Sequence, residues 1–84
     1  MYLHVGGDVI IRASDIVAIL ERNTVVTGAA TREFLGFMRA RGKVEDLSNG
    51  DAKTVVVCRD RVLLSPISAS TLKKRIGDLD HLRS

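Results

Sequence analysis

Hydrophobic residues occur in short runs separated by turn-forming residues, which is the pattern of a sheet built from short strands. In the N-terminal half, residues 1–5 and 9–12 predict a hairpin that turns at Gly6-Gly7-Asp8. The apolar run 16–20 follows. Periodicity alone does not distinguish a strand from a helix there, but the short length and the β-branched residues favour a third strand.

The C-terminal half predicts three further strands. Loop 48–53 carries Asn49-Gly50, a strong tight-turn signal. Arg59 and Asp60 interrupt an apolar segment where a second hairpin is expected to turn. The predicted strands are residues 44–47, 54–58 and 61–65.

A first helix is predicted from an N-cap at Thr27 to Arg41, after a connection over residues 21–26. Gly42 is expected in the left-handed conformation after its last turn. Both phenylalanines lie on this helix, so we expect it to cover the sheet. The apolar face comprises Ala30, Phe34, Phe37, Met38 and Arg41, widened by Leu35.

A second helix is predicted over residues 69–79. The buried strand ends at Pro66, which cannot donate to a strand ladder, and Ser68 or Ser70 can cap the helix. Leu72, Ile76 and Leu79 form its apolar stripe. The prediction is therefore a single α+β domain over residues 1–84, with a small antiparallel-leaning sheet of about five to six strands covered by two helices.

Length and composition favour burial against a partner. A chain of 84 residues buries roughly 60–65% of its unfolded surface, and this one has no tryptophan to enlarge its core. A homo-oligomer would add core, and a compact monomer is the alternative. Cys58 is the only cysteine, and we interpret it as a small core residue in a reducing cytoplasm. No signal peptide or membrane-length apolar run is seen, so we expect a cytoplasmic protein without a membrane partner.

Residues that could perform catalysis do not converge. His4 and His81 lie at opposite ends of the chain, and adjacent carboxylates at Glu45 and Asp46 would point to opposite faces of a strand. The glycines at Gly6-Gly7 are isolated turn residues and lack the longer glycine-rich loop of a phosphate cradle. We therefore predict no enzyme, no catalytic residues, no metal site, no cofactor and no small-molecule substrate.

The basic residues carry more information about function than the candidate catalytic residues do. The net charge is +3, and Lys73, Lys74 and Arg75 are consecutive on the predicted second helix. Three roles are open for these side chains: a solvated helix face, a contact to nucleic acid, or salt bridges between subunits. Arg12 and Lys53 adjoin loops and would reach phosphates if the loops share one rim. No aromatic residue alternates with these cations, so duplex backbone contact is favoured over base stacking.

Several stretches together resemble one known family. They are Met1–Gly6, Asp15–Ile19, Glu33–Leu35, Ser65-Pro66-Ile67-Ser68 and Thr71–Arg75, and the similarity spans nearly the whole chain. The chain resembles the RemA/RemB family of extracellular matrix (biofilm) regulators of spore-forming Gram-positive bacteria.

This resemblance implies a small α+β subunit that assembles into a homo-oligomeric ring and regulates transcription by presenting basic residues to double-stranded DNA. RemA-type proteins carry an arginine pair in the loop matching residues 48–53, where this chain has Asp51, Ala52 and Lys53. The nucleic-acid-binding residues expected here are Arg12, Lys53, Lys73, Lys74 and Arg75. The alternative is an oligomeric structural or adaptor protein that binds another protein instead of DNA.

Overall fold

The structure, a computed structural model, describes the backbone of residues 1–83 and the side chains of residues 1–77. Within them the chain forms six strands and three α-helices, with a short 3₁₀ turn at Ala13–Asp15. The elements are β1 (Tyr2–Gly6), β2 (Val9–Arg12), β3 (Ile16–Glu21), α1 (Arg22–Thr27), α2 (Ala29–Ala40), β4 (Val44–Asp46), β5 (Thr54–Cys58), β6 (Val62–Ser65) and α3 (Ala69–Arg83).

The strands divide between two sheets, which corrects the prediction of one sheet. β1 and β2 form an antiparallel hairpin of their own, and the other four strands have the order β3-β5-β6-β4. β5 is antiparallel to both neighbours, whereas β4 is parallel to β6. The α+β class and the predominantly antiparallel pairing are confirmed.

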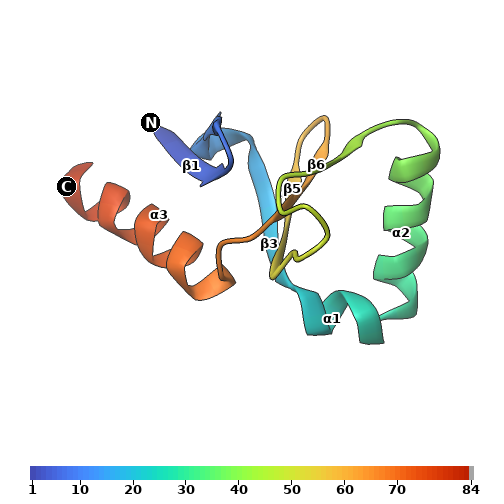
Figure 1. Cartoon of the computed structure of the whole chain (residues 1–84). Helices are drawn as coiled ribbons and strands as arrows, with labels where there is room; N and C mark the ends of the chain where they lie inside the picture. Colours follow the sequence, from blue (N-terminus) through green and yellow to red (C-terminus); the bar gives the residue numbers. More distant parts are fainter. Residues whose placement is uncertain (84) are drawn as a thin grey trace.

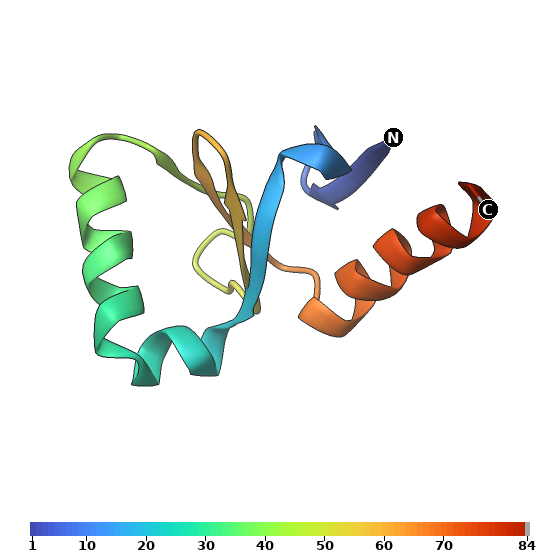
Figure 2. The same ribbon diagram turned by 180° about the vertical axis from the view of Figure 1, so that it is seen from behind.

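The helices and the hairpin lie on opposite sides of the four-stranded sheet. Figures 1 and 2 show α3 and the β1–β2 hairpin on one side of the central strands and α2 on the other. Alternate residues of the central strands therefore face different layers, as the strand period of two requires. In the part of the chain that the structure describes, no helix is long and apolar enough to cross a membrane.

The larger core lies between the sheet, the hairpin and α3. Val56 and Leu63 of the central strands meet Val5 of β1 and Leu72 of α3, and all four side chains are fully buried. Ile76 packs against the same cluster, which confirms the predicted stripe of α3 as far as residue 76; Leu79 lies outside the described side chains. The cluster comprises Leu3, Val5, Ile11, Val56, Cys58, Leu63 and Leu72.

The smaller core lies beneath α1 and α2, which we call the arm (residues 22–41). Val25 and Leu35 are the arm residues buried against the sheet. The prediction that α2 covers the sheet is confirmed, but Phe34 and Phe37, assigned to its covering face, are 39% and 55% exposed. α2 instead packs through Leu35 and the half-buried Met38.

The helix α1 was missed, because residues 21–26 were predicted to be a connection. Its β-branched residues have low helix propensity, but burial of Val25 against the sheet outweighs that preference. Thr27 is the last residue of α1 and its hydroxyl donates to the Asn23 carbonyl (2.9 Å), so it does not cap α2. Gly28 holds the N-cap position of α2. Arg41 is the C-cap, and Gly42 has the expected left-handed φ of 68°.

The segment Ser65–Ser68 ties the layers together. The buried Ser65 hydroxyl donates to the Val5 carbonyl (2.5 Å) and accepts from the Ile67 amide (3.1 Å). Thr54 of β5 donates its hydroxyl to the Ile67 carbonyl (2.6 Å). These bonds satisfy buried polar groups at a chain reversal, and they fix the point from which α3 begins.

Candidate nucleic-acid interface

A hollow of about 310 Å³ opens where α3 begins. It lies where the chain passes from β3 into α1 and from the 48–53 loop into β5. Two cations, Arg22 and Lys53, contribute to its wall beside the hydroxyls of Ser68 and Ser70. Its lining residues are Glu21, Arg22, Asn23, Ala52, Lys53, Ser68, Ala69 and Ser70.

The backbone of Lys53 is fixed by two neighbours. Its amide donates to the Ser65 carbonyl (2.9 Å), and its carbonyl accepts from the Arg22 amide (3.1 Å). Lys53 thus joins the end of β6 to the start of α1, while its side chain is exposed. The exposed Lys53 ammonium therefore extends from a backbone position that two hydrogen bonds fix.

The loop that precedes Lys53 is organised by Asp46. Its carboxylate accepts from the Ser48 amide (2.8 Å), the Ser48 hydroxyl (2.5 Å) and the Gly50 amide (3.0 Å). These bonds, that of the Ser48 hydroxyl first, lower the pKa of Asp46. Asn49 and Gly50 both adopt positive φ, 56° and 90°, which confirms the predicted tight turn.

Ser68 caps α3, as one of the two predicted alternatives. Its Oγ accepts from the Thr71 amide at 3.3 Å. The amides of Ala69 and Ser70, at the helix start, have no partner within the helix because of their position. Free amides and the helix dipole make such a position attractive to an anion.

Lys73 and Lys74 continue this basic surface along α3. They are three and four residues beyond Ser70, so they share its side of the helix, and both are exposed. Together with Arg22 and Lys53 they provide four cations along the N-terminal half of α3. We call this set, Arg22, Lys53, Lys73 and Lys74 with Ser70, the basic edge.

Arg22 was not among the residues predicted from the sequence. The segment that contains it was interpreted as a connection, so nothing indicated that it would lie beside Lys53. The available signal was a cation immediately after a strand whose end pairs with β5: Glu21 lies opposite Thr54, the residue after Lys53.

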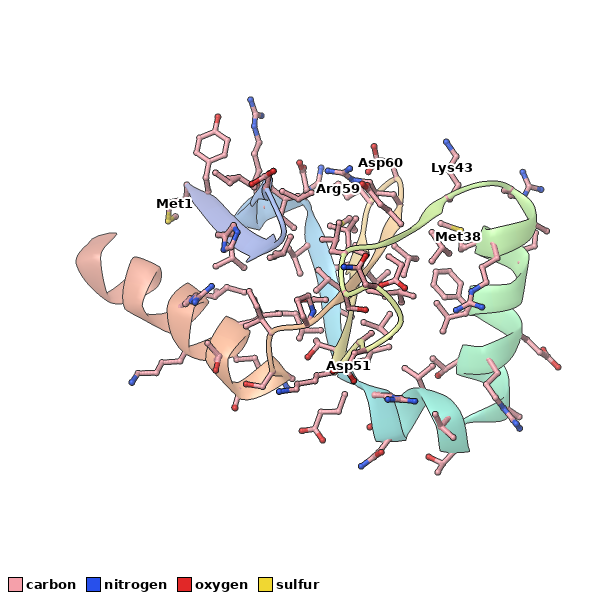
Figure 3. All side chains as sticks on the ribbon, viewed as in Figure 1. Met1, Met38, Lys43, Asp51, Arg59 and Asp60 are labelled. Atoms are coloured by element: carbon pink, nitrogen blue, oxygen red, sulfur yellow. The ribbon has the colours of Figure 1, made fainter. Side chains whose placement is uncertain are left out.

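Two of the predicted residues lie apart from the basic edge. Arg75 donates from Nη1 to the His4 carbonyl (3.1 Å), which links α3 to β1. Arg12 borders a different hollow of about 230 Å³ with Asp15, Asp60 and Arg61. Figure 3 shows Asp51 and the pair Arg59–Asp60 at opposite ends of the central strands, so the loops near Lys53 and Arg12 do not share one rim within a subunit.

Acidic side chains moderate the potential of the basic edge. Glu21 lines the same hollow as Lys53, and Asp51 is exposed two residues before it. Neither is placed in a salt bridge; the one found among the described residues joins Arg61 to Glu45 (3.5 Å) at the other end of the sheet. The hollow therefore has a mixed lining in which cations exceed carboxylates by one.

Among the described residues, no three His, Cys, Asp or Glu side chains are close enough to hold a metal ion. Cys58 is buried in the larger core, and burial raises the pKa of its thiol. A protonated, enclosed thiol confirms the interpretation of Cys58 as a core residue.

Comparison with known proteins gives two matches. The model of one family, described as "RemA-like: Extracellular matrix regulatory protein A-like", matches residues 2–76. The chain is also 37% identical over 75 residues to "Extracellular matrix regulatory protein B" of Bacillus subtilis (strain 168). This alignment covers 89% of each chain. Both the hollow at the start of α3 and the Ser65–Ser68 segment lie within the matched range.

Proposed function

Because the chain belongs to the RemA-like family of extracellular matrix regulatory proteins, we propose that it regulates transcription in the cytoplasm by binding duplex DNA. The active species is a ring-shaped homo-oligomer, and each subunit contacts DNA phosphates through its basic edge. The observation that carries this proposal is the convergence of Lys53, Arg22 and the start of α3 on one hollow.

The chemistry of the hollow suits a phosphate oxygen. Lysine and arginine side chains attract the anion, while the Ser70 hydroxyl and the first amides of α3 can donate hydrogen bonds to it. Lys73 and Lys74 follow along the helix, where an adjacent phosphate of the same strand would lie. The exposed part of α3 has no Asn, Gln and Arg set for reading base edges, so we propose recognition of backbone and shape.

Oligomerisation turns a modest charge into effective DNA binding. One subunit has a net charge of +3, which steers DNA weakly. Each neutralised phosphate adds about 0.9 to the slope of log affinity against log salt concentration, so repeated basic edges multiply the effect. A ring would also present them at a regular spacing to bent or wrapped DNA.

The test compares charge-reversed variants at constant salt. We expect Lys53→Glu to weaken duplex binding more than tenfold, and Lys73→Glu with Lys74→Glu to weaken it further, since each change removes an attraction and adds a repulsion. Fluorescence anisotropy of a labelled duplex measures affinity, and light scattering verifies the assembly. Arg59→Glu is the matched control, because Arg59 is exposed at the far end of β5.

Neutralising Glu21 tests the same site in the opposite direction. Glu21→Gln removes a carboxylate from the lining of the hollow while keeping the size of the side chain, so duplex affinity should rise by a few fold. Unchanged affinity in Glu21→Gln and in both charge reversals would refute the basic edge as the DNA site.

An oligomeric adaptor that binds a protein is the second candidate. It is favoured by Glu21 and Asp51, which lie beside the cations and weaken the attraction of the site for DNA. An intact assembly that fails to bind duplex DNA at low salt would support this candidate over the first.

A further inference from the structure

The subunit exposes two separate groups of large apolar side chains. On the arm, Val26, Phe34 and Phe37 are 57%, 39% and 55% exposed; we call them the arm patch. On the N-terminal strands, Tyr2, Ile10 and Val17 are 63%, 60% and 66% exposed; we call them the strand patch. Exposed aromatic and branched side chains of this kind are typical of interaction surfaces.

Two members of the strand patch, Tyr2 and Ile10, belong to the β1–β2 hairpin, and the third, Val17, belongs to β3. Figures 1 and 2 place the β1–β2 hairpin and α2 on opposite sides of the central strands, in a subunit 39 Å long. One subunit therefore cannot cover one patch with the other. Any protein that covers them comes from outside the chain.

The arm is distinctly basic, whereas the charges around the strand patch are mixed. α2 with its C-cap, residues 29–41, carries three arginines and one glutamate, a net charge of +2. Residues 1–20 carry Asp8, Asp15 and one arginine, a net charge of −1. Contact between two arm patches would place like charges together, whereas the strand patch offers the arginines of the arm carboxylates at Asp15 and Asp60.

We infer that the arm patch of one subunit packs onto the strand patch of the next copy of this chain. The contact is heterologous, with a different surface on each partner, so every subunit uses both patches and the contact repeats around a closed ring. This inference rests on the proposed homo-oligomer and identifies the surfaces that form it.

Local geometry provides an anchor and a recess for this contact. On the arm, the Arg41 guanidinium stacks 4.3 Å from the ring centroid of the exposed Phe37. Aromatic and arginine side chains are the residues that most often dominate binding energy. On the other surface, a hollow of about 230 Å³ opens beside Tyr2 and Ile10, and Asp15, Asp60, Arg12 and Arg61 also line it. Asp15 and Asp60 there can pair with the incoming Arg41.

Paired variants test this arrangement by native mass spectrometry without DNA. Phe37→Asp disables the arm patch and Ile10→Asp the strand patch; both positions are exposed, so circular dichroism should show folded subunits. We expect each variant alone to be monomeric. An equimolar mixture should give a 1:1 heterodimer, since one intact arm patch still meets one intact strand patch.

A second pair of variants and a surface control complete the mass measurement. Val26→Asp mixed with Tyr2→Asp should repeat the result at independent positions, and Thr71→Asp at an exposed position on α3 should keep the wild-type mass. A monomeric wild type, a wild-type mass in either single variant, or a mixture that stays monomeric would overturn the inference. If the oligomer masses are as expected but the wild-type assembly does not bind duplex DNA, the proposed function is refuted and this interface stands.

Discussion

The two sides of the four-stranded sheet differ in how completely the chain covers them. On the side of the hairpin and α3, Leu63, Leu72, Val5 and Val56 are completely enclosed. On the arm side, Val62 of the sheet is also enclosed, but the most buried arm residues, Val25 and Leu35, keep 7% and 8% exposure, and the aromatic rings of α2 are exposed. The chain therefore covers one face of the sheet completely and the other face only in part.

This difference suggests a division of tasks. The enclosed side anchors α3 and Lys53 through the Ser65–Ser68 segment, so it fixes the basic edge proposed to meet DNA. The open side keeps apolar side chains available for a neighbouring subunit. A small chain can thus hold a binding site rigidly without burying all of its apolar surface internally.

Truncating one core leucine on each side should give the largest contrast. Leu72→Ala leaves a cavity in the enclosed core and should lower the free energy of unfolding by about 3–5 kcal/mol, whereas Leu35→Ala, beside the open hollow under the arm, should cost about 2 kcal/mol. Urea unfolding at one fixed protein concentration measures both. An equal or larger loss in Leu35→Ala would contradict the comparison.

A smaller effect is expected where β1 meets Pro66. Gly6 has φ 130°, and a Cβ there would lie 2.7 Å from the Pro66 Cδ. Gly7 also has positive φ, 54°, but nothing lies within 4 Å of its Cβ position, so it is the matched control. Gly6→Ala should destabilise the fold by about 2 kcal/mol and Gly7→Ala by about 1 kcal/mol, both by urea unfolding. Equal losses would show that the contact with Pro66 is loose.

The smallest effect concerns Asp46, which orders the loop before Lys53. Its pKa is lowered in the folded state, so its contribution to stability is present above the ordinary value of 3.8 and disappears as the pH falls through the folded pKa. Asp46→Asn should therefore flatten the decline of the urea midpoint between about pH 5 and pH 3. Identical pH profiles of wild type and variant would mean that the loop does not depend on this carboxylate.

Much of the fold follows from the sequence because its signals are local. All six strand positions were predicted to within two residues, since apolar runs bounded by glycine, proline or Asn-Gly depend only on neighbouring residues. The division into two sheets, α1 and the exposure of the phenylalanines were not predicted. They depend on which surfaces meet, and a periodic pattern shows that a helix has an apolar face without showing what covers it.

The candidate site was predicted in part for the same reason. Lys53 lies beside the start of α3, the helix that carries Lys73 and Lys74, because Ser68 starts α3 beside the 48–53 loop, and both features leave sequence signals. The partnership of Arg22 with Lys53 depends on the pairing of β3 with β5, and the engagement of Arg75 on the His4 carbonyl joins residues 71 apart. Long-range contacts of this kind leave no local pattern.

The central claim is that repeated basic edges bind DNA phosphates, and the salt dependence of wild-type binding tests it most directly. Anisotropy of a labelled duplex would be measured from about 50 to 200 mM salt, and the slope of log affinity against log salt gives the number of phosphates neutralised. The account predicts a steep negative slope, larger than the roughly four cations of a single subunit would give. No binding at the lowest salt, or binding indifferent to salt, would contradict it.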